Sequence, residues 1–403
     1  MMTMHKNRYE KMKNTVKNYP GGGVICTEII LLLYIFKSMM GFRWPGIYVM
    51  TNHLITSRDG FVPRTLISTI LELIVGDRIY KYQFWYFWIL FISFLFIFYI
   101  IVVTVREVIW KENILFFLII ASYVISPYPK YYIHEAGYFE QYGYLLLALL
   151  IEISLKGSIK KTCVSASVFS FIAVLVSETN LFLIAPCLFT IGFLEILEIE
   201  KVKINRIAGY VAAFIPSLIY SLLSFCIRVP KQKMDSISEI CNQKANFPLR
   251  QDVFTYFWDD RSNADSWGRA LHAIPINCII VPLLLVIVIT ILLYHANKKR
   301  AAAAYFVMSV LIGLFNYSIV IVAWDLHRYY WCIYMQIFIL TIYIIRRHLE
   351  NHVLDKNEWA YLLLMILAFI GMSGFEFDLF DGAHYLKTIQ EMKEVLLNYG
   401  TPL

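Results

Sequence analysis

The chain has 403 residues, of which 59% are hydrophobic and only 16% are charged, and its mean hydropathy is +0.61. Soluble domains carry about 25% charged residues, so this composition excludes a soluble globular protein and predicts a polytopic membrane protein. The formal net charge of +7 would suit a nucleic-acid partner. The basic residues instead gather in short connectors between apolar runs, and we therefore exclude nucleic acid as a partner.

Apolar runs of spanning length predict an all-α integral membrane fold with about 11 transmembrane helices. A helix needs about 20 mostly apolar residues to cross a bilayer. The predicted spans lie near residues 22–42, 84–104, 112–127, 139–155, 162–178, 181–199, 207–227, 274–294, 301–323, 329–346 and 357–374. We expect them to form one membrane domain over residues 1–374, followed by an amphipathic tail over residues 375–403.

Lysine and arginine concentrate in every second connector, which predicts how the chain is oriented. The basic segments lie within residues 1–17, 106–111, 156–161, 201–206, 298–300 and 346–356. Cytoplasmic connectors carry an excess of lysine and arginine, so we expect these segments and the N-terminus in the cytoplasm. An odd number of spans then places the C-terminal tail outside. The two long loops, residues 43–83 and 228–273, belong to the outer face as well.

The first outer loop contains the stretch "ITSRDGFVPRTLIST", in which Arg58, Asp59 and Arg64 stand close together. After Pro63, which suits the first turn of a helix, polar and apolar residues follow a helical period as far as Val75. This pattern predicts an interfacial helix whose polar stripe starts at Arg64. The alternative is an amphipathic helix that only covers the bundle.

Two further clusters of polar residues fall on the predicted outer face. The stretch "IHEAGYFEQYGYL" carries His134, Glu135 and Glu140, and "VSETN" carries Glu178 in a short turn. Ionisable groups next to lipid usually face a cavity or a partner, which favours a functional role. A surface pair between Lys130 and Glu135, and ordinary turn chemistry around Glu178, are the alternatives.

A fourth cluster, "VAWDLHRYYW", lies in a short outer connector between two predicted spans. It contains Trp324, Asp325, His327, Arg328 and Tyr329. Arginine presents a rigid fork to phosphate oxygens, and aromatic faces suit sugar rings or the membrane interface. An ion pair between Asp325 and Arg328 is the alternative.

Together these clusters predict a site for a saccharide carried on a polyprenyl phosphate or diphosphate. The phosphate would be bound by Arg58, Arg64, His327 and Arg328. The catalytic carboxylate, which takes a proton from the attacking hydroxyl, would be Asp59 first and Glu135 second. The saccharide would be bound by His134, Glu140, Glu178, Trp324, Asp325 and Tyr329. The sequence contains no pattern of metal ligands and indicates no cofactor. A divalent cation at the site is compatible with the sequence, although no motif points to it.

The architecture and these motifs resemble the GT-C superfamily of membrane glycosyltransferases, which use lipid-linked sugar donors. In that superfamily the first outer loop holds interfacial helices and an acidic residue that acts as a base or orients the acceptor. The stretch "TSRDGFVPRTLIST" occupies that place here, so the resemblance implies this role for Asp59. The set "RDGFVPRTLI", "IHEAGYFEQYGYLL", "SETNLFLIAP" and "WDLHRYYW" also looks like multispan proteins of bacterial surface-polysaccharide clusters. In that set an arginine commonly follows the glycine of the second motif, where this chain has Tyr138.

The resemblance implies a glycosyltransferase or polysaccharide polymerase of the bacterial cytoplasmic membrane, acting on its outer face in capsule or other cell-envelope assembly. Expected partners are a polyprenyl-linked saccharide, membrane lipid and other polysaccharide-assembly proteins. A flippase for lipid-linked saccharides is the alternative, although the sequence has no internal repeat of the kind that transporters have. A membrane acyltransferase would need a histidine on the cytoplasmic side, where His348 and His352 lie and are expected to be solvated.

Overall fold

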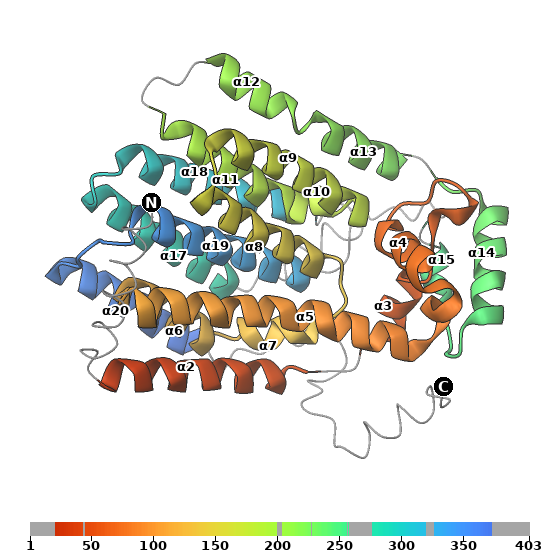
Figure 1. Cartoon of the computed structure of the whole chain (residues 1–403), viewed down its shortest axis with the longest axis horizontal. Coiled ribbons are helices and arrows are strands. Elements are labelled where there is room, and N and C mark those ends of the chain that lie inside the picture. The colour runs from red at the N-terminus through yellow and green to blue at the C-terminus, as the bar shows by residue number, and fades with distance from the viewer. Residues whose placement is uncertain are drawn as a thin grey trace, which may run out of the picture.

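The computed structural model describes residues 21–42, 45–199, 204–226, 228–255, 257, 276–319 and 326–372. Every element in these ranges is helical, and most helices run along the long axis of the molecule (Figure 1). The long helices are α2 (Gly21–Met40), α5 (Tyr82–Thr104), α6 (Ile114–Ile125), α8 (Glu140–Lys156), α9 (Ile159–Val176), α11 (Ala185–Leu197), α12 (Ile204–Ala212), α13 (Ile215–Cys226), α17 (Ile276–His295), α18 (Lys299–Ser318), α19 (Leu326–His348) and α20 (Lys356–Met372). The predicted tail over residues 375–403 lies outside the described residues.

Among the described residues, seven helical segments are long and apolar enough to cross a membrane, and the bent pair of α6 and α7 (Tyr128–His134) brings the number to eight at most. The chain is therefore a multi-pass membrane protein, but the predicted number of 11 spans is not confirmed. Helices α8 and α20 lie in predicted spans but have only 17 residues each. Large apolar side chains are exposed on outward faces, as contact with lipid requires, and include Leu32, Phe98, Leu314 and Leu364.

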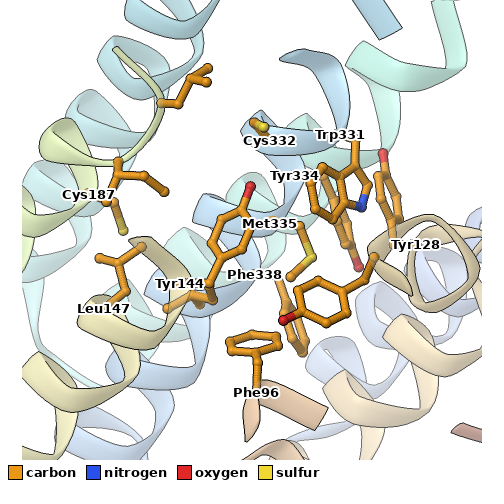
Figure 2. Close-up of a cluster of buried hydrophobic side chains, with 14 of the residues drawn as sticks. Phe96, Tyr128, Tyr144, Leu147, Cys187, Trp331, Cys332, Tyr334, Met335 and Phe338 are labelled. Atoms are coloured by element: carbon orange, nitrogen blue, oxygen red, sulfur yellow. The ribbon is translucent and has the colours of Figure 1, made fainter. Parts of the chain in front are cut away.

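Helix α19 lies at the centre of the bundle, with nearly all of its described side chains buried. Its aromatic rings stack on those of α6 and α7. The ring centroids of Tyr334 and Tyr128 are 3.5 Å apart, and those of Phe338 and Tyr123 are 4.1 Å apart. Figure 2 shows Tyr128, Tyr334 and Phe338 in one cluster with Phe96 of α5. Stacked aromatic pairs have a defined geometry, so they fix the register of α19 against α6 and α7.

A bend of 61° separates α6 from α7, at Ser126 and Pro127. Proline has no N–H to donate and its ring clashes with the preceding turn, so a straight helix cannot continue through it. Carbonyl groups at the bend instead accept from side chains. Ser126 Oγ donates to Tyr123 O at 2.6 Å, and Lys37 Nζ of α2 donates to Ile125 O. The bend thus keeps backbone polar groups satisfied inside an apolar bundle.

Short helices gather at one end of the bundle and form a unit that we name the cap (Figure 1). The cap consists of α3 (Ile47–Asn52), η1 (Ser57–Asp59), α4 (Leu66–Val75), η2 (Gly76–Tyr80), α14 (Lys231–Lys244) and α15 (Gln251–Thr255). Hydrogen bonds join its two segments across the sequence: Arg250 N–H donates to Thr51 Oγ1 at 3.1 Å, and Asn246 N–H donates to Tyr80 O at 3.2 Å. The two long loops of the sequence therefore pack together over the same end of the bundle.

The end of the bundle opposite the cap carries a network of charged side chains. The Arg346 side chain of α19 is only 2% exposed and lies 3.0 Å from Glu107 Oε1 and 2.7 Å from Glu152 Oε1. Arg106 lies 3.1 Å from Glu152, and Lys111 lies 2.9 Å from Glu107. Two of the basic connectors predicted for the cytoplasm thus meet at this end, and one of them begins on a π-helical turn, η3 (Val105–Trp110), that continues α5.

We predict that Gly41→Ala destabilises the protein. A Cβ at Gly41, directly after α2, would overlap the backbone carbonyl of Lys130 in α7, so one of the two helices would have to move. Overpacking of this kind costs about 1–3 kcal/mol, and the Tm of the detergent-solubilised protein should fall.

Gly313→Ala is the matched control, because nothing lies within 4 Å of a Cβ at that position in α18. Alanine favours a helix more than glycine does, so the Tm of this variant should hold or rise. Equal Tm values for the two variants would contradict the close contact between α2 and α7.

Candidate functional site

The turn that leads into α4 contains two residues with positive φ. Gly60 has a φ of 108°, which glycine adopts freely, and Arg64 has a φ of 63°, which is uncommon for a residue with a side chain. Because the backbone of Arg64 has a left-handed conformation, α4 begins at Leu66 and not at Pro63, where the sequence pattern places its start. A left-handed conformation costs about 1–3 kcal/mol, which interactions of the Arg64 side chain have to offset.

Arg64 forms a buried ion pair with Glu178. Its Nε lies 2.8 Å from Glu178 Oε1 and 2.9 Å from Oε2, and its Nη2 lies 2.5 Å from Oε1. The two side chains are 12% and 3% exposed. Glu178 lies in the turn after α9, where Ser221 Oγ of α13 donates to its backbone carbonyl at 3.0 Å. The pair therefore ties the cap to the ends of α9 and α13.

Helix α4 turns its polar stripe toward the protein and an apolar side outward. Ser68 is fully buried, and Thr69 Oγ1 accepts the N–H of Ser57 at 2.9 Å. Leu73 and Ile74 are 83% and 71% exposed. An exposed apolar side at the end of a membrane bundle is what the predicted interfacial helix requires.

A second ion pair joins α19 to α8 at the cap end of the bundle. Arg328 Nε lies 3.3 Å from Glu140 Oε1, and the two side chains are 12% and 3% exposed. The guanidinium carbon of Arg328 also lies 4.4 Å from the ring centre of Tyr138 and 5.3 Å from that of Tyr329. Glu140 begins α8, where the helix dipole favours a negative charge. Arg328 thus contacts a carboxylate and two aromatic faces.

A small apolar cluster adjoins both ion pairs. Phe139 and Tyr142 of α8 pack with Val176 of α9, and the first turn of α4 packs against them. In the sequence, cluster residues Leu66, Phe139 and Val176 lie within two positions of Arg64, Glu140 and Glu178, respectively. The structure therefore brings the two predicted phosphate-binding arginines and two predicted saccharide-binding carboxylates to one region beneath the cap.

His134 and Glu135 form a third pair at the end of α7, with His134 Nδ1 3.0 Å from Glu135 Oε1. The turn after this pair is fixed by Gln141, which belongs to the same polar stretch of the sequence but was not predicted as a site residue. Its Oε1 accepts from Ser93 Oγ at 2.7 Å and from Gly137 N–H at 3.1 Å. Gly137 has a φ of 95°, and a Cβ there would overlap neighbouring side chains, so only glycine fits. The backbone that carries the predicted carboxylates is thus held firmly.

His53 is a residue that the sequence patterns miss, and it is fully buried at the end of α3. Its Nδ1–H donates to Val49 O at 2.9 Å, which leaves Nε2 to accept from the Tyr142 hydroxyl at 3.3 Å. Trp88 Nε1–H in turn donates to that hydroxyl at 2.9 Å. Burial lowers the pKa of His53 to about 4, so its imidazole is neutral at pH 7.

Arg58 and Asp59 lie on η1, where Arg58 is at the surface of the cap. The Arg58 side chain is 70% exposed and lies 3.5 Å from Glu72 Oε1, which makes it a surface pair. The side chain of Asp59 lies outside the described part of the structure. A Cβ on the next residue, Gly60, would be 2.8 Å from Lys233 Nζ, so an ammonium group of α14 lies over this turn.

The fourth sequence cluster is described only in part. Arg328 and Tyr329 have described side chains, and Tyr329 is 2% exposed. Trp324, Asp325 and the side chain of His327 lie outside the described residues. The predicted roles of these three residues therefore stay predictions.

The arrangement beneath the cap can bind an anion by exchange. Each arginine is neutralised by a carboxylate, as a charge in a low-dielectric environment has to be. A phosphate offers the guanidinium more oxygen acceptors and more negative charge than a carboxylate does. When a phosphate takes over the arginine, the carboxylate is released and can accept a proton or a sugar hydroxyl. Among the described residues, the one group of side chains close enough to hold a metal ion lies at the other end of the molecule.

Comparison with known proteins does not assign this chain to a family. No family model matches the chain, and neither a curated protein nor a solved structure matches it. The resemblance to the GT-C superfamily thus stays a prediction from motifs, and function has to be argued from the site itself.

We predict that Arg64→Met destabilises the protein more than the double substitution Arg64→Met with Glu178→Leu. The single change leaves the Glu178 carboxylate, 3% exposed, buried without this arginine, at a cost of about 3 kcal/mol. The double change removes both charges and should recover most of the lost Tm. Arg58→Met is the control, since its partner contact is at the surface. A double variant no more stable than the single one would contradict a buried pair.

We predict that His53 makes the protein less stable in mild acid. Its pKa is 6.5 when unfolded and about 4 in the folded protein. As the pH falls from 6.5 toward 4, the unfolded chain takes up a proton that the folded protein does not, so stability is lost over this window, by up to roughly 3 kcal/mol. His53→Asn keeps a donor for Val49 O and should flatten the fall in Tm between pH 7 and pH 4.5. An unchanged pH profile in this variant would refute the assignment.

Proposed function

We propose that the chain is a membrane glycosyltransferase or polysaccharide polymerase. It would transfer a saccharide from a polyprenyl phosphate or diphosphate carrier to an acceptor at the cap end of the bundle. In the orientation predicted from the basic connectors, this end faces outward from the cytoplasmic membrane. The product would enter a surface polysaccharide or glycoconjugate.

The observation that carries this proposal is the presence of two buried arginine–carboxylate pairs beneath the cap, Arg64 with Glu178 and Arg328 with Glu140. Apolar residues of similar size often stabilise a fold as well as a buried ion pair does, so stability alone gives little reason to keep these charges. Arg64 also holds a left-handed backbone. The cost of these features favours a task that needs the arginine fork itself, and binding of phosphate is the task for which arginine is best suited.

The proposed transfer uses the exchange of partners at these arginines. The carrier phosphate would displace Glu140 from Arg328 and Glu178 from Arg64, and the two guanidinium groups would stabilise the negative charge of the leaving phosphate. The acceptor oxygen would form a bond to the anomeric carbon while the bond from that carbon to the carrier oxygen breaks. Asp59, or Glu135 in its place, would take the proton of the acceptor hydroxyl.

The surroundings of the site suit a lipid-linked sugar. Tyr138 and Tyr329 lie against Arg328, so a sugar ring next to the phosphate would meet aromatic faces. The exposed apolar side of α4, with Leu73 and Ile74, lies where a polyprenyl chain would approach from the bilayer. A polymerase and a single-step transferase need the same groups, and we make the same proposal for both.

Transport of the lipid-linked saccharide is a second candidate, which the broken helices favour. Helix α6 bends by 61° into α7, and a short helix α10 (Asn180–Leu183) is interrupted before α11. Discontinuous helices are typical of transporters, in which they bind the substrate near the middle of the membrane. The charged residues beneath the cap instead lie at helix ends, since Arg64 precedes α4, Glu178 follows α9 and Glu140 begins α8. We therefore prefer transfer.

The test is transfer activity of the full chain in vesicles that contain a polyprenyl-diphosphate-linked saccharide. Arg328→Gln removes a donor to the leaving phosphate and should lower the rate by about 100-fold or more. Asp59→Asn should lower it by about 100- to 10,000-fold if this carboxylate is the base. Arg328→Lys keeps the charge but loses the fork, and an intermediate rate is expected.

Lys244→Gln is the control, because Lys244 pairs with Asp77 at the surface of the cap. It should transfer saccharide at the rate of the unmodified protein. Unchanged rates in Arg328→Gln and Asp59→Asn would refute transfer at this site. Movement of intact donor across the vesicle membrane without formation of product would favour transport instead.

A further inference from the structure

Four side chains that bind metals in other proteins meet at the end of the bundle opposite the cap. His295 is the last residue of α17, His352 lies in the connector after α19, and Asp355 and Glu358 belong to the start of α20. His295 Nδ1 lies 3.1 Å from Glu358 Oε1, and His352 Nε2 lies 2.9 Å from the same oxygen. Ligand atoms of His295, Asp355 and Glu358 all lie within 4.8 Å of one another, and the His352 nitrogen contacts Glu358 but lies outside this group of three. Three separate segments of the chain thus converge on one carboxylate.

One oxygen of the Glu358 carboxylate accepts a backbone hydrogen bond, and the other oxygen faces the two histidines. Its Oε2 accepts the N–H of Asp355 at 2.8 Å, while Asp355 Oδ1 accepts the N–H of Glu358 at 2.8 Å. This reciprocal pattern is the capping box of a helix, and it accounts for Oε2. Capping does not account for Oε1, which faces two imidazole nitrogens from different segments.

Glu358 is also buried without a fixed positive charge beside it. Its side chain is 1% exposed, and within the described part of the chain no lysine or arginine forms an ion pair with it. A buried carboxylate needs a compensating charge. Its neighbours are two imidazoles and a second carboxylate, and a divalent cation would balance both carboxylates at once.

We propose that His295, His352, Asp355 and Glu358 form a zinc site. Two imidazole nitrogens with two carboxylate oxygens suit zinc, which binds such ligands at about 2.0–2.2 Å in a tetrahedron. Tetrahedral ligands at that distance are about 3.3 Å apart, so the separations of 3.1 and 2.9 Å from Glu358 to His295 and His352 need to open only slightly. The His352 ring also has to turn toward the other ligands, because it lies outside the group of three. Zinc binds the lone pairs of His295 Nδ1 and His352 Nε2, and protons on these atoms move to the other ring nitrogen or to solvent.

The site joins the end of α17 and the connector 349–355 to the start of α20. Helix α20 has only 17 residues, and many of its side chains are exposed, so an additional attachment at its first turn would stabilise its position. Because the site lies at the far end from the arginine–carboxylate pairs, it does not depend on the proposed transferase activity.

The test is binding of zinc to the full chain, purified in detergent with an affinity tag that contains no histidine and stripped with a chelator. After addition of zinc chloride and removal of the excess, elemental analysis should find about one zinc per chain. The Tm should rise on the order of 5 °C when zinc is at about 100 times its Kd. His295→Ala and His352→Ala should each lose most of the bound zinc and the zinc-dependent rise in Tm.

These two histidine substitutions are preferred to Glu358→Gln, because Glu358 also caps α20 and its loss could unfold the helix. Glu350→Gln is the matched control: Glu350 lies in the same connector but pairs with Lys111 at 2.9 Å. It should bind zinc as the unmodified protein does. Absence of zinc from the unmodified protein, or equal zinc in both histidine variants, would overturn the site. An equal rise in Tm with magnesium would overturn the assignment to zinc.

Discussion

The requirement that a buried arginine meet a carboxylate determines how the cap is attached to the bundle. The Arg64 side chain is 12% exposed, and Glu178 offers both carboxylate oxygens to it. The direction of its side chain is set by a left-handed backbone, which in turn delays the start of α4 until Leu66. The polar stripe of α4 then faces the protein, and its apolar side faces outward. One ion pair thus fixes the orientation of the element that covers the candidate site.

The two ends of the molecule use buried charge in different ways. At the end opposite the cap, Arg346 contacts two carboxylates and the hydroxyl of Tyr99, and those carboxylates have further basic partners. If one side chain of such a network is removed, Arg346 still has its other partners, which suits a structural role. Beneath the cap Arg64 pairs with the carboxylate in the turn after α9, and Arg328 pairs with the carboxylate of the first residue of α8.

Composition and periodicity predicted the all-helical membrane fold and the helix that became α4, because burial of apolar residues in lipid leaves a direct trace in the sequence. The number of spans was not confirmed, since hydropathy measures apolar content and not where a helix is broken, as at Pro127. His348, expected to be solvated, has a side chain that is 4% exposed and lies 3.5 Å from Glu198. Charge clusters predicted Arg64, Glu178, Glu140 and Arg328 as site candidates, but not which of them would pair. His53 was missed because its partner, Tyr142, is distant in sequence and carries no local pattern. Gln141 belongs to the second cluster, but its contact with Ser93 could not be predicted for the same reason.

The distance along the sequence between Arg64 and Glu178 also matters while the protein is being made. The two residues are separated by 114 positions, and ribosomes add about 5–20 residues per second, so Arg64 waits roughly 6–20 s for its counter-charge. During that interval the first half of the cap cannot be tied to α9, and its polar stripe stays in contact with water or lipid headgroups. The second half, α14 and α15, is added later still. Attachment of the cap is therefore a late step in biogenesis, and the nascent chain must insert α2 and α5 without it.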